Sequence, residues 1–159
     1  MEETPVRILI GLQFSARGCE MNEGWLGDDY LILFDEAEVV AATDRYAISQ
    51  LLPGYQVLGL TGWDDFILRN PAGQTYSLPT VPMNPKYLSP FPLPGPGASL
   101  RRDPRYSERI KWYVKPIVFG GEPGVGANLI WVSHEQHAEL VRWWNDMYRS
   151  LEGYRDTPA

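Results

Sequence analysis

Residues 28–40 read DDYLILFDEAEVV, and this stretch places a strand directly before a helix. Tyr30–Phe34 is apolar throughout and rich in β-formers, which predicts a strand at the centre of a sheet. Asp35 is placed to cap the following helix, and Glu38 stands at its third position to complete an acidic capping box. The apolar face of this helix, which extends to about Ser49, is predicted from Val39, Val40, Thr43, Tyr46 and Ala47.

An antiparallel meander is predicted after this helix. Leu52-Pro53-Gly54 interrupts the helical pattern, and three short β-forming segments follow it. Asn70-Pro71-Ala72-Gly73 suits a type I turn, because proline occupies its second position and glycine its fourth. The predicted strands are residues 55–60, 65–69 and 74–78, and residues 61–64 form the other turn.

Further elements are predicted on both sides of this centre. Residues 6–14 favour a strand, with a short helix as the alternative, and residues 18–27 favour a loop. Two more strands are predicted at 112–119 and 129–132. Residues 1–159 are long enough for one domain with its own core.

The last helix has a clear predicted start. Ser133-His134-Glu135-Gln136 matches a capping box, and Gly153 is placed to end the helix. Its predicted buried stripe consists of residues at helical spacing, namely His137, Leu140, Val141, Trp144, Met147, Tyr148 and Leu151. We therefore expect a C-terminal strand-turn-strand-helix unit at about 111–152.

Prolines dominate a long connection between the two halves. Eight prolines lie in residues 79–104, and they leave little room for helix or ladder pairing. We expect a Pro-rich loop at about 82–104 that lies over the domain. The run from Ser89 to Gly97 offers an alternative, a polyproline ligand for another protein.

Composition narrows the class of protein. The chain is 44% hydrophobic and 21% charged, as expected for a folded domain. Cys19 is the only cysteine, so an internal disulfide is excluded and a reducing compartment is favoured. No apolar run reaches the roughly 18 residues that a membrane span needs, and acidic rather than basic residues lead the start MEETPVR, unlike a signal peptide. We therefore expect a cytoplasmic protein with no membrane partner.

Charge is divided unequally along the chain. The net charge is −6, and residues 1–80 carry twelve acidic and only four basic side chains. A nucleic-acid backbone would be repelled by this half, so no nucleic-acid partner is expected. A basic protein would be attracted to it. The alternative is that the acidic face serves only to keep the protein in solution.

Gly121–Gly126 imitates the start of a phosphate-binding loop. Such a loop needs a lysine and then a hydroxyl, but this chain has Ala127 and Asn128. It must also lead into a helix, whereas the predicted strand 129–132 follows here. The stretch is therefore predicted to be a turn between two strands, and no cofactor is expected.

Catalytic and metal sites are also not expected. His134 and His137 are three apart rather than the four of zinc proteases, and no third ligand is close in sequence. His137 belongs to the apolar stripe, which favours a core histidine, while His134 is expected to face solvent. The doublets Asp28-Asp29 and Asp64-Asp65 would point to opposite faces if each lay on a strand.

The order of these motifs resembles the SUKH superfamily, also called the Smi/Knr-type domain. Gly24–Val39 is similar to its glycine turn, Tyr-Leu-x-Leu strand and acidic helix, and the resemblance covers about residues 20–92. In Gly62-Trp63-Asp64-Asp65-Phe66, Trp63 stands where the family has the second glycine of a turn. The family's N-terminal Leu-Pro-x-x-Tyr helices have little room before Gly24. The remaining matched segments are 52–55, 58–59 and 81–83, with weaker similarity at 115–121 and 143–145.

This resemblance implies one SUKH-like α+β domain, with a mixed, mostly antiparallel sheet of about six strands and helices packed on it. It further implies a bacterial immunity protein, which neutralises a cognate toxin by non-covalent binding and is not an enzyme. The acidic first half fits a basic toxin as partner. A regulatory or scaffolding module and, less favoured, a hydrolase remain as alternatives. The candidate partner-binding residues are Glu23, Trp25, Asp28, Asp29, Trp63, Asp64 and Asp65.

Overall fold

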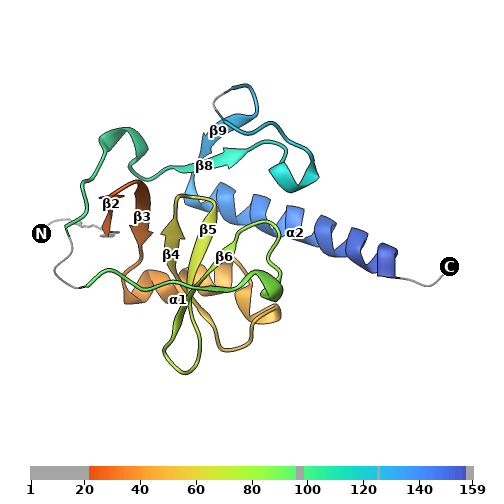
Figure 1. The fold of residues 1–159 in the computed structure, drawn as a ribbon, viewed down its shortest axis with the longest axis horizontal. Helices are drawn as coiled ribbons and strands as arrows, with labels where there is room; N and C mark the ends of the chain where they lie inside the picture. Colours follow the sequence, from red (N-terminus) through yellow and green to blue (C-terminus); the bar gives the residue numbers. More distant parts are fainter. Residues whose placement is uncertain (1–21, 96–98, 125, 157–159) are drawn as a thin grey trace, which may run out of the picture.

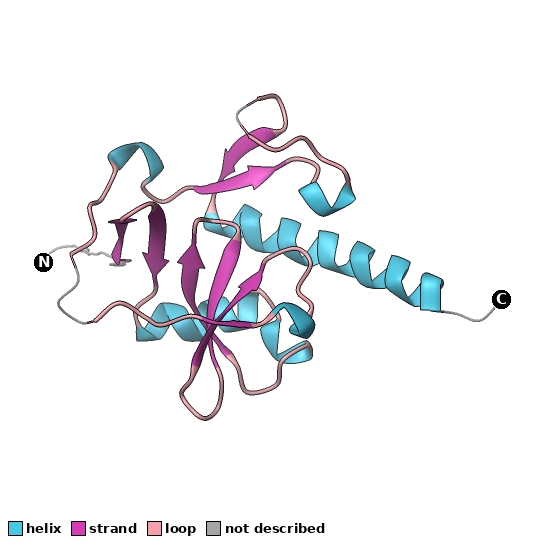
Figure 2. Ribbon diagram, viewed as in Figure 1, coloured by secondary structure: helices cyan, strands magenta, loops and turns pink. Residues whose placement is uncertain are grey.

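The computed structural model describes residues 22–95, 99–124 and 126–156, with side chains described up to Leu151. The predicted strand 6–14 and Cys19 lie outside these residues. Figure 1 shows a twisted sheet beside two helices and a separate small ladder above it. Figure 2 shows the same arrangement by type of element.

The main sheet has six strands, and the prediction of an α+β fold with a largely antiparallel sheet of about six strands is confirmed. The strands lie in chain order, and each neighbouring pair is antiparallel. The three-strand meander is confirmed to within one residue at each end. The strands are β2 (Asn22–Leu26), β3 (Asp29–Leu33), β4 (Gln56–Thr61), β5 (Asp65–Arg69), β6 (Thr75–Pro79) and β7 (Ser89–Pro90).

The prediction of a loop over 18–27 is wrong for β2. Trp25 pairs with Tyr30 of β3, and a hairpin turn with Gly27 at φ 65° joins the two strands. The outer edge of β2 is covered by Arg101, whose backbone exchanges two hydrogen bonds with that of Trp25. A side chain at Gly24 would collide with this crossing segment, because its Cβ would lie 2.7 Å from the Arg101 backbone. Gly24, which suggested a loop, therefore allows the segment around Arg101 to cross close to β2.

The remaining elements are two α-helices, a two-stranded ladder and four short 3₁₀ helices. The helices are α1 (Glu36–Arg45) and α2 (His134–Asp156), and the ladder pairs β8 (Ile110–Tyr113) with β9 (Leu129–Val132). Figure 1 shows the ladder above the first turns of α2, whose C-terminal half extends beyond the sheet. The 3₁₀ helices are η1 (Ile48–Gln50), η2 (Pro85–Tyr87), η3 (Pro104–Tyr106) and η4 (Ile117–Phe119).

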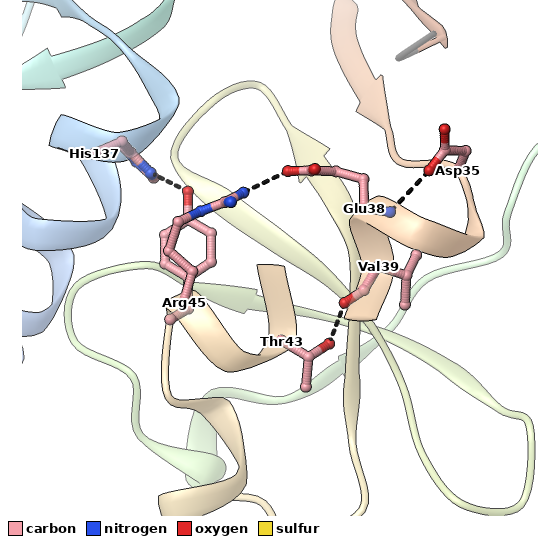
Figure 3. Close-up of polar contacts among 7 residues, drawn as sticks. Asp35, Glu38, Val39, Thr43, Arg45 and His137 are labelled. Carbon is pink, nitrogen blue, oxygen red and sulfur yellow. Dashed lines mark hydrogen bonds and ion pairs between the residues drawn. The ribbon is translucent and has the colours of Figure 1, made fainter. Parts of the chain in front are cut away.

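Helix α1 begins as predicted and ends earlier. The Asp35 carboxylate accepts a hydrogen bond from the Glu38 amide at 2.8 Å, but the Glu38 side chain turns to Arg45 and does not complete the box (Figure 3). The helix ends at Arg45 because Ala47 has a left-handed backbone, with φ 54°. Val40, predicted on the apolar face, is 67% exposed. Val39 and Tyr46 are buried as predicted, and Ala42, which was not predicted, completes the buried face.

The sheet is buried on both faces, which explains the continuous apolar pattern of Tyr30–Phe34. Ile32 belongs to the large core that α1 and α2 complete. Leu31, on the opposite face, packs in a second cluster against Phe91 and Leu100. The Pro-rich connection therefore supplies the cover for the second face of the sheet.

This connection is tied to the sheet edge at β7. Ser89 pairs with Ser77 of β6, and the Thr75 hydroxyl donates to the Phe91 carbonyl oxygen at 2.6 Å. Residues 89–91 are thus held as a short edge strand, where proline is tolerated. Residues 96–98 lie outside the described part of the chain.

The prediction of a strand over 112–119 is wrong beyond Tyr113, because Pro116 and η4 turn the chain. The stretch that imitates a phosphate loop is instead held by Asn128. This side chain accepts from the Lys115 amide and donates to the carbonyl oxygens of Lys115 and Glu122. Leu129 then begins β9, so a strand rather than a helix follows, as predicted.

Helix α2 shows a complete capping box. The Ser133 hydroxyl accepts from the Gln136 amide, and the Gln136 side chain accepts from the Ser133 amide. The helix continues past Gly153 to Asp156, so the predicted end is wrong. His137 and Val141 are fully buried, whereas Met147 and Leu151, also predicted in the buried stripe, are 37% and 40% exposed. The stripe is buried only where α2 lies against the sheet.

Candidate functional site

Five aromatic rings from distant segments meet at one end of the sheet. Tyr30 of β3 stacks on Trp63, with ring centroids 4.9 Å apart, and Tyr106 stacks on Trp131 of β9 at the same distance. Trp25 meets Trp63 edge-on at 5.9 Å. Because aromatic rings attract each other in both arrangements, this cluster fixes the turn between β4 and β5 against the C-terminal ladder.

Trp63 has an unusual backbone for a bulky residue. Gly62 and Trp63 both have left-handed conformations, with φ 59° and 62°. The Gly62 amide donates to the Tyr30 carbonyl oxygen at 2.8 Å, and the Asp64 amide donates to that of Gly62. Residues other than glycine rarely adopt this backbone conformation unless their surroundings hold them in it. Here the aromatic cluster holds Trp63 in place.

A hollow of about 220 Å³ opens beside this turn. Asp64 and Asp65 both line it, and the alternation expected of a doublet on a strand does not apply here because β5 begins only at Asp65. Asp64 precedes β5 and belongs to the tight turn. Its backbone is fixed, since its carbonyl oxygen accepts from both the amide and the hydroxyl of Thr80. The rest of the lining is Pro79, Thr80, Val81, Trp112, Tyr113, Pro116, Ile117 and Val118.

The two carboxylates have different surroundings. The Lys111 ammonium lies 2.8 Å from the exposed Asp64 carboxylate, and it also lies over the rings of Trp63 and Tyr113. Asp65 is half-buried, and burial raises the pKa of its carboxyl group. The neighbouring Asp64 charge raises this pKa further, while Lys111 opposes the rise. A second cation at Asp65 would therefore relieve an unfavourable charge.

The rim of the hollow is apolar and open. Ile117 and Val118 are each 50% exposed, and Val114 nearby in sequence is equally so. All three side chains of η4 are apolar, because the segment consists of Ile117, Val118 and Phe119. A hollow lined by two carboxylates and by exposed aliphatic side chains suits a long cationic side chain, whose stem is apolar and whose head is charged.

The other predicted residues lie near this end of the sheet but outside the hollow. Asp28 and Asp29 are exposed at the β2–β3 turn. This turn lies at the same end as Trp63, since Leu31 pairs with Thr61. Trp25 is half-buried, and its indole N–H donates to Asp103 at 3.5 Å.

Glu23 lies inside the protein. It is 3% exposed, and its carboxylate accepts from the Glu108 amide and pairs with Arg102 at 3.4 Å. Burial and this carboxylate together raise the pKa of Tyr30 to about 12. Glu23 therefore holds the 102–108 segment against β2 and presents no surface to a partner.

Nothing in the sequence pointed to Ile117 and Val118, which line the hollow, or to Lys111, which pairs with Asp64 beside it. Lys111 directly precedes the strand predicted at 112–119, and that pattern does not single it out. Its partner Asp64 is 47 positions away, and no local pattern connects the two. Ile117 and Val118 were assigned to a strand, and only the turn at Pro116 brings them to the rim.

The two histidines lie in the core between α1, β8 and α2. The Tyr46 hydroxyl lies 2.6 Å from His137 Nδ1, and the Trp112 ring meets the His137 ring edge-on (Figure 3 shows His137). Burial, with the charges of His134 and Arg45, lowers the pKa of His137 to about 3. His134 does not face solvent as expected, because both ring nitrogens are buried. Within the described residues no three His, Cys, Asp or Glu side chains are grouped to hold a metal ion.

No protein-family description, curated protein or solved structure matches this chain. The SUKH resemblance therefore stays a prediction that rests on the sequence motifs. Among the described residues, neither helix is long and apolar enough to span a membrane.

Proposed function

We propose that this protein is a non-catalytic immunity protein of the SUKH type, which neutralises a basic protein toxin in the bacterial cytoplasm. One observation carries the proposal. Asp64 and Asp65 line the same hollow, beside the exposed aliphatic side chains of Ile117 and Val118. Interface hot spots combine apolar side chains, which lose their water when the partner binds, with a charged group that fixes the orientation of the partner.

A lysine or arginine of the toxin fits this hollow best. Its charged head would reach Asp65, where the half-buried carboxyl group has a raised pKa in the free protein. A bound cation favours the ionised carboxylate, so binding and deprotonation support each other. The aliphatic stem would contact Ile117 and Val118.

Lys111 matters for selectivity in this proposal. It already pairs with Asp64, so the free protein holds one cation at the hollow and has room for a single further positive charge. A partner that presents a carboxylate would meet two acidic groups and be repelled. The electrostatic contrast between these two kinds of partner favours a basic toxin surface.

The structure also bears on the two alternatives. A scaffolding role for the run from Ser89 would require release of a segment that pairs with β6 and covers Leu31 through Phe91. A hydrolase that uses His137 would need a ring that instead lies fully buried against Tyr46. These contacts oppose the scaffolding role and a hydrolase that uses the histidine pair, whereas a hydrolase that uses the Asp64-Asp65 doublet stays an alternative.

The test is co-purification of the full chain with the toxin that the adjacent reading frame encodes. The double substitution Asp64→Asn and Asp65→Asn is expected to raise the dissociation constant by about a hundredfold or more. The matched control is Asp28→Asn with Asp29→Asn, which removes the same charge at the same end of the sheet outside the hollow. We expect it to change the dissociation constant by less than about threefold.

Three results would contradict the proposal. The immunity role is wrong if the toxin does not bind and the protein gives no protection in cells that express it. The assignment of the hollow is wrong if both double variants weaken binding equally. Binding that survives in high salt without change would also exclude an electrostatic anchor.

A further inference from the structure

The outward face of α2 carries charges in a regular order. Glu139, Arg142, Asp146 and Arg149 alternate in sign along it, and all four are exposed. Residues three and four apart share one face of a helix, so these side chains form a single line. Trp143 lies on the same face, and 54% of its surface is exposed. Its ring meets that of Trp144 edge-on, and the remaining half of this large apolar side chain is open.

This order of charges complements itself when two copies of the helix lie antiparallel. In an antiparallel pair of α2 helices, Glu139 would face Arg149 of the second copy, and Arg142 would face its Asp146. Both pairings have the same midpoint, at residue 144, so a single crossing satisfies them together. The two-fold axis repeats each pairing and gives four ion pairs. A parallel pair in register would instead place like charges opposite each other.

A groove lies directly beside this face. It has a volume of about 550 Å³ and separates α2 from the end of α1 and the following residues. Tyr46, Gln50, Leu51 and Met83 line its far side, and Arg142 and Asp146 line its near side. Trp143 also lines this groove, so a second copy seated on the charged line would cover the exposed indole.

We propose that this face binds a second copy of the chain and that the protein forms a two-fold dimer through antiparallel α2 helices. Closed two-fold contacts require one patch that complements itself, and the alternating charges with a central tryptophan meet this requirement. The inference does not depend on the immunity role, because the hollow that carries the role lies on other elements.

The test begins with the mass of the full chain in solution. Sedimentation equilibrium should give twice the 18.1 kDa of the chain. Glu139→Arg places an arginine opposite Arg149 of the other copy at both symmetric contacts. We expect it to raise the dimer dissociation constant at least about tenfold. Adding Arg149→Glu to the same chain restores opposite charges at both contacts and should restore dimerisation.

The double variant distinguishes ion pairs between the two copies from charge effects within one helix. Arg149 bonds to Asp146 in the same helix, so Arg149→Glu puts like charges side by side there and cannot rescue by stabilising α2. Glu135→Arg makes the same change in charge one turn earlier, outside the paired positions. It should leave the mass of the dimer in solution unchanged. The proposal is overturned by a monomer at concentrations of about 100 μM. It is also overturned by a dimer that Glu139→Arg does not weaken, or that the second substitution does not restore.

Discussion

Trp63 combines a strained backbone with favourable packing. An L-residue in the left-handed region costs about 1–2 kcal/mol relative to glycine, because its Cβ crowds the next carbonyl oxygen. The Trp63 ring offsets this cost through its contacts with Tyr30, Trp25 and Trp131. The SUKH resemblance would place glycine at this position, and the positive φ shows why glycine is suited to it.

At position 63 we expect a glycine variant to be more stable than an alanine variant, the reverse of the usual order. Both Trp63→Ala and Trp63→Gly lose the ring and should lower the free energy of unfolding by about 3 kcal/mol. We expect the glycine variant to be the more stable of the two by about 1 kcal/mol, since alanine keeps the backbone strain. Urea denaturation followed by circular dichroism measures the difference.

Trp25 provides the matched control, because it contacts the same rings from within β2 and is not among the residues with positive φ. There we expect Trp25→Ala to be more stable than Trp25→Gly by about 0.5–1 kcal/mol, the usual order in a strand. The same order at both positions would contradict the account of strain at Trp63.

The Asp64-Asp65 doublet marks how far single residues could be interpreted from the sequence. Both residues follow Trp63 in the acidic first half of the chain and were selected as partner-binding candidates. Their convergence was not predictable, because it depends on a turn conformation that Trp63 adopts only through distant aromatic contacts. Glu23, chosen on charge alone, is buried through its contacts with the 102–108 segment.

At the scale of elements, local signals determined most of the fold. The bounds of β5 and β9 agree with the prediction because both are apolar runs between turn residues. β2 was missed because Gly24 and Gly27 suggest a loop, whereas its pairing with β3 is a tertiary effect. The predicted strand 112–119 was too long because β-formers continue past Pro116 although their ladder partners do not. Helix ends were the least accurate, as the extension of α2 past Gly153 shows.

The start of α2 offers a direct measurement of capping. Ser133→Ala removes the hydroxyl that accepts from the Gln136 amide, and it should lower the free energy of unfolding by about 1 kcal/mol. Ser150→Ala makes the identical change at an exposed position inside the same helix. Because alanine is the better helix former, this control should be neutral or slightly stabilising. Equal losses at both positions would mean that the hydroxyl does not cap the helix.

For the whole molecule, the acidic first half and the more basic second half meet in space. Lys111 pairs with Asp64, and Arg102 pairs with Glu23, so part of the charge difference seen along the sequence is neutralised within the fold. No sequence pattern could show this, because these partners are separated by 47 and 79 positions. The acidic face available to a partner is therefore smaller than the net charge suggests.

Acid stability is a second property of the whole molecule, and it centres on His137, where α1, β8 and α2 meet. The pKa of this residue is about 3 in the folded protein, against about 6.5 for histidine in an unfolded chain. Between these values the unfolded state binds the extra proton, so stability rises with pH. The contribution of neutral His137 is complete above about pH 6.5 and is lost as the pH falls towards 3.

We therefore expect the free energy of unfolding to fall by about 1.4 kcal/mol for each pH unit well inside this window. His137→Gln cannot bind the proton, so its stability should decline less steeply between pH 6 and 4 by about this amount. His134, whose pKa is also lowered by burial, contributes in the same direction in both proteins. Asp65, whose pKa is raised, acts in the opposite direction and also cancels in the comparison. Parallel pH profiles for the wild type and His137→Gln would show that burial of neutral His137 does not govern acid stability.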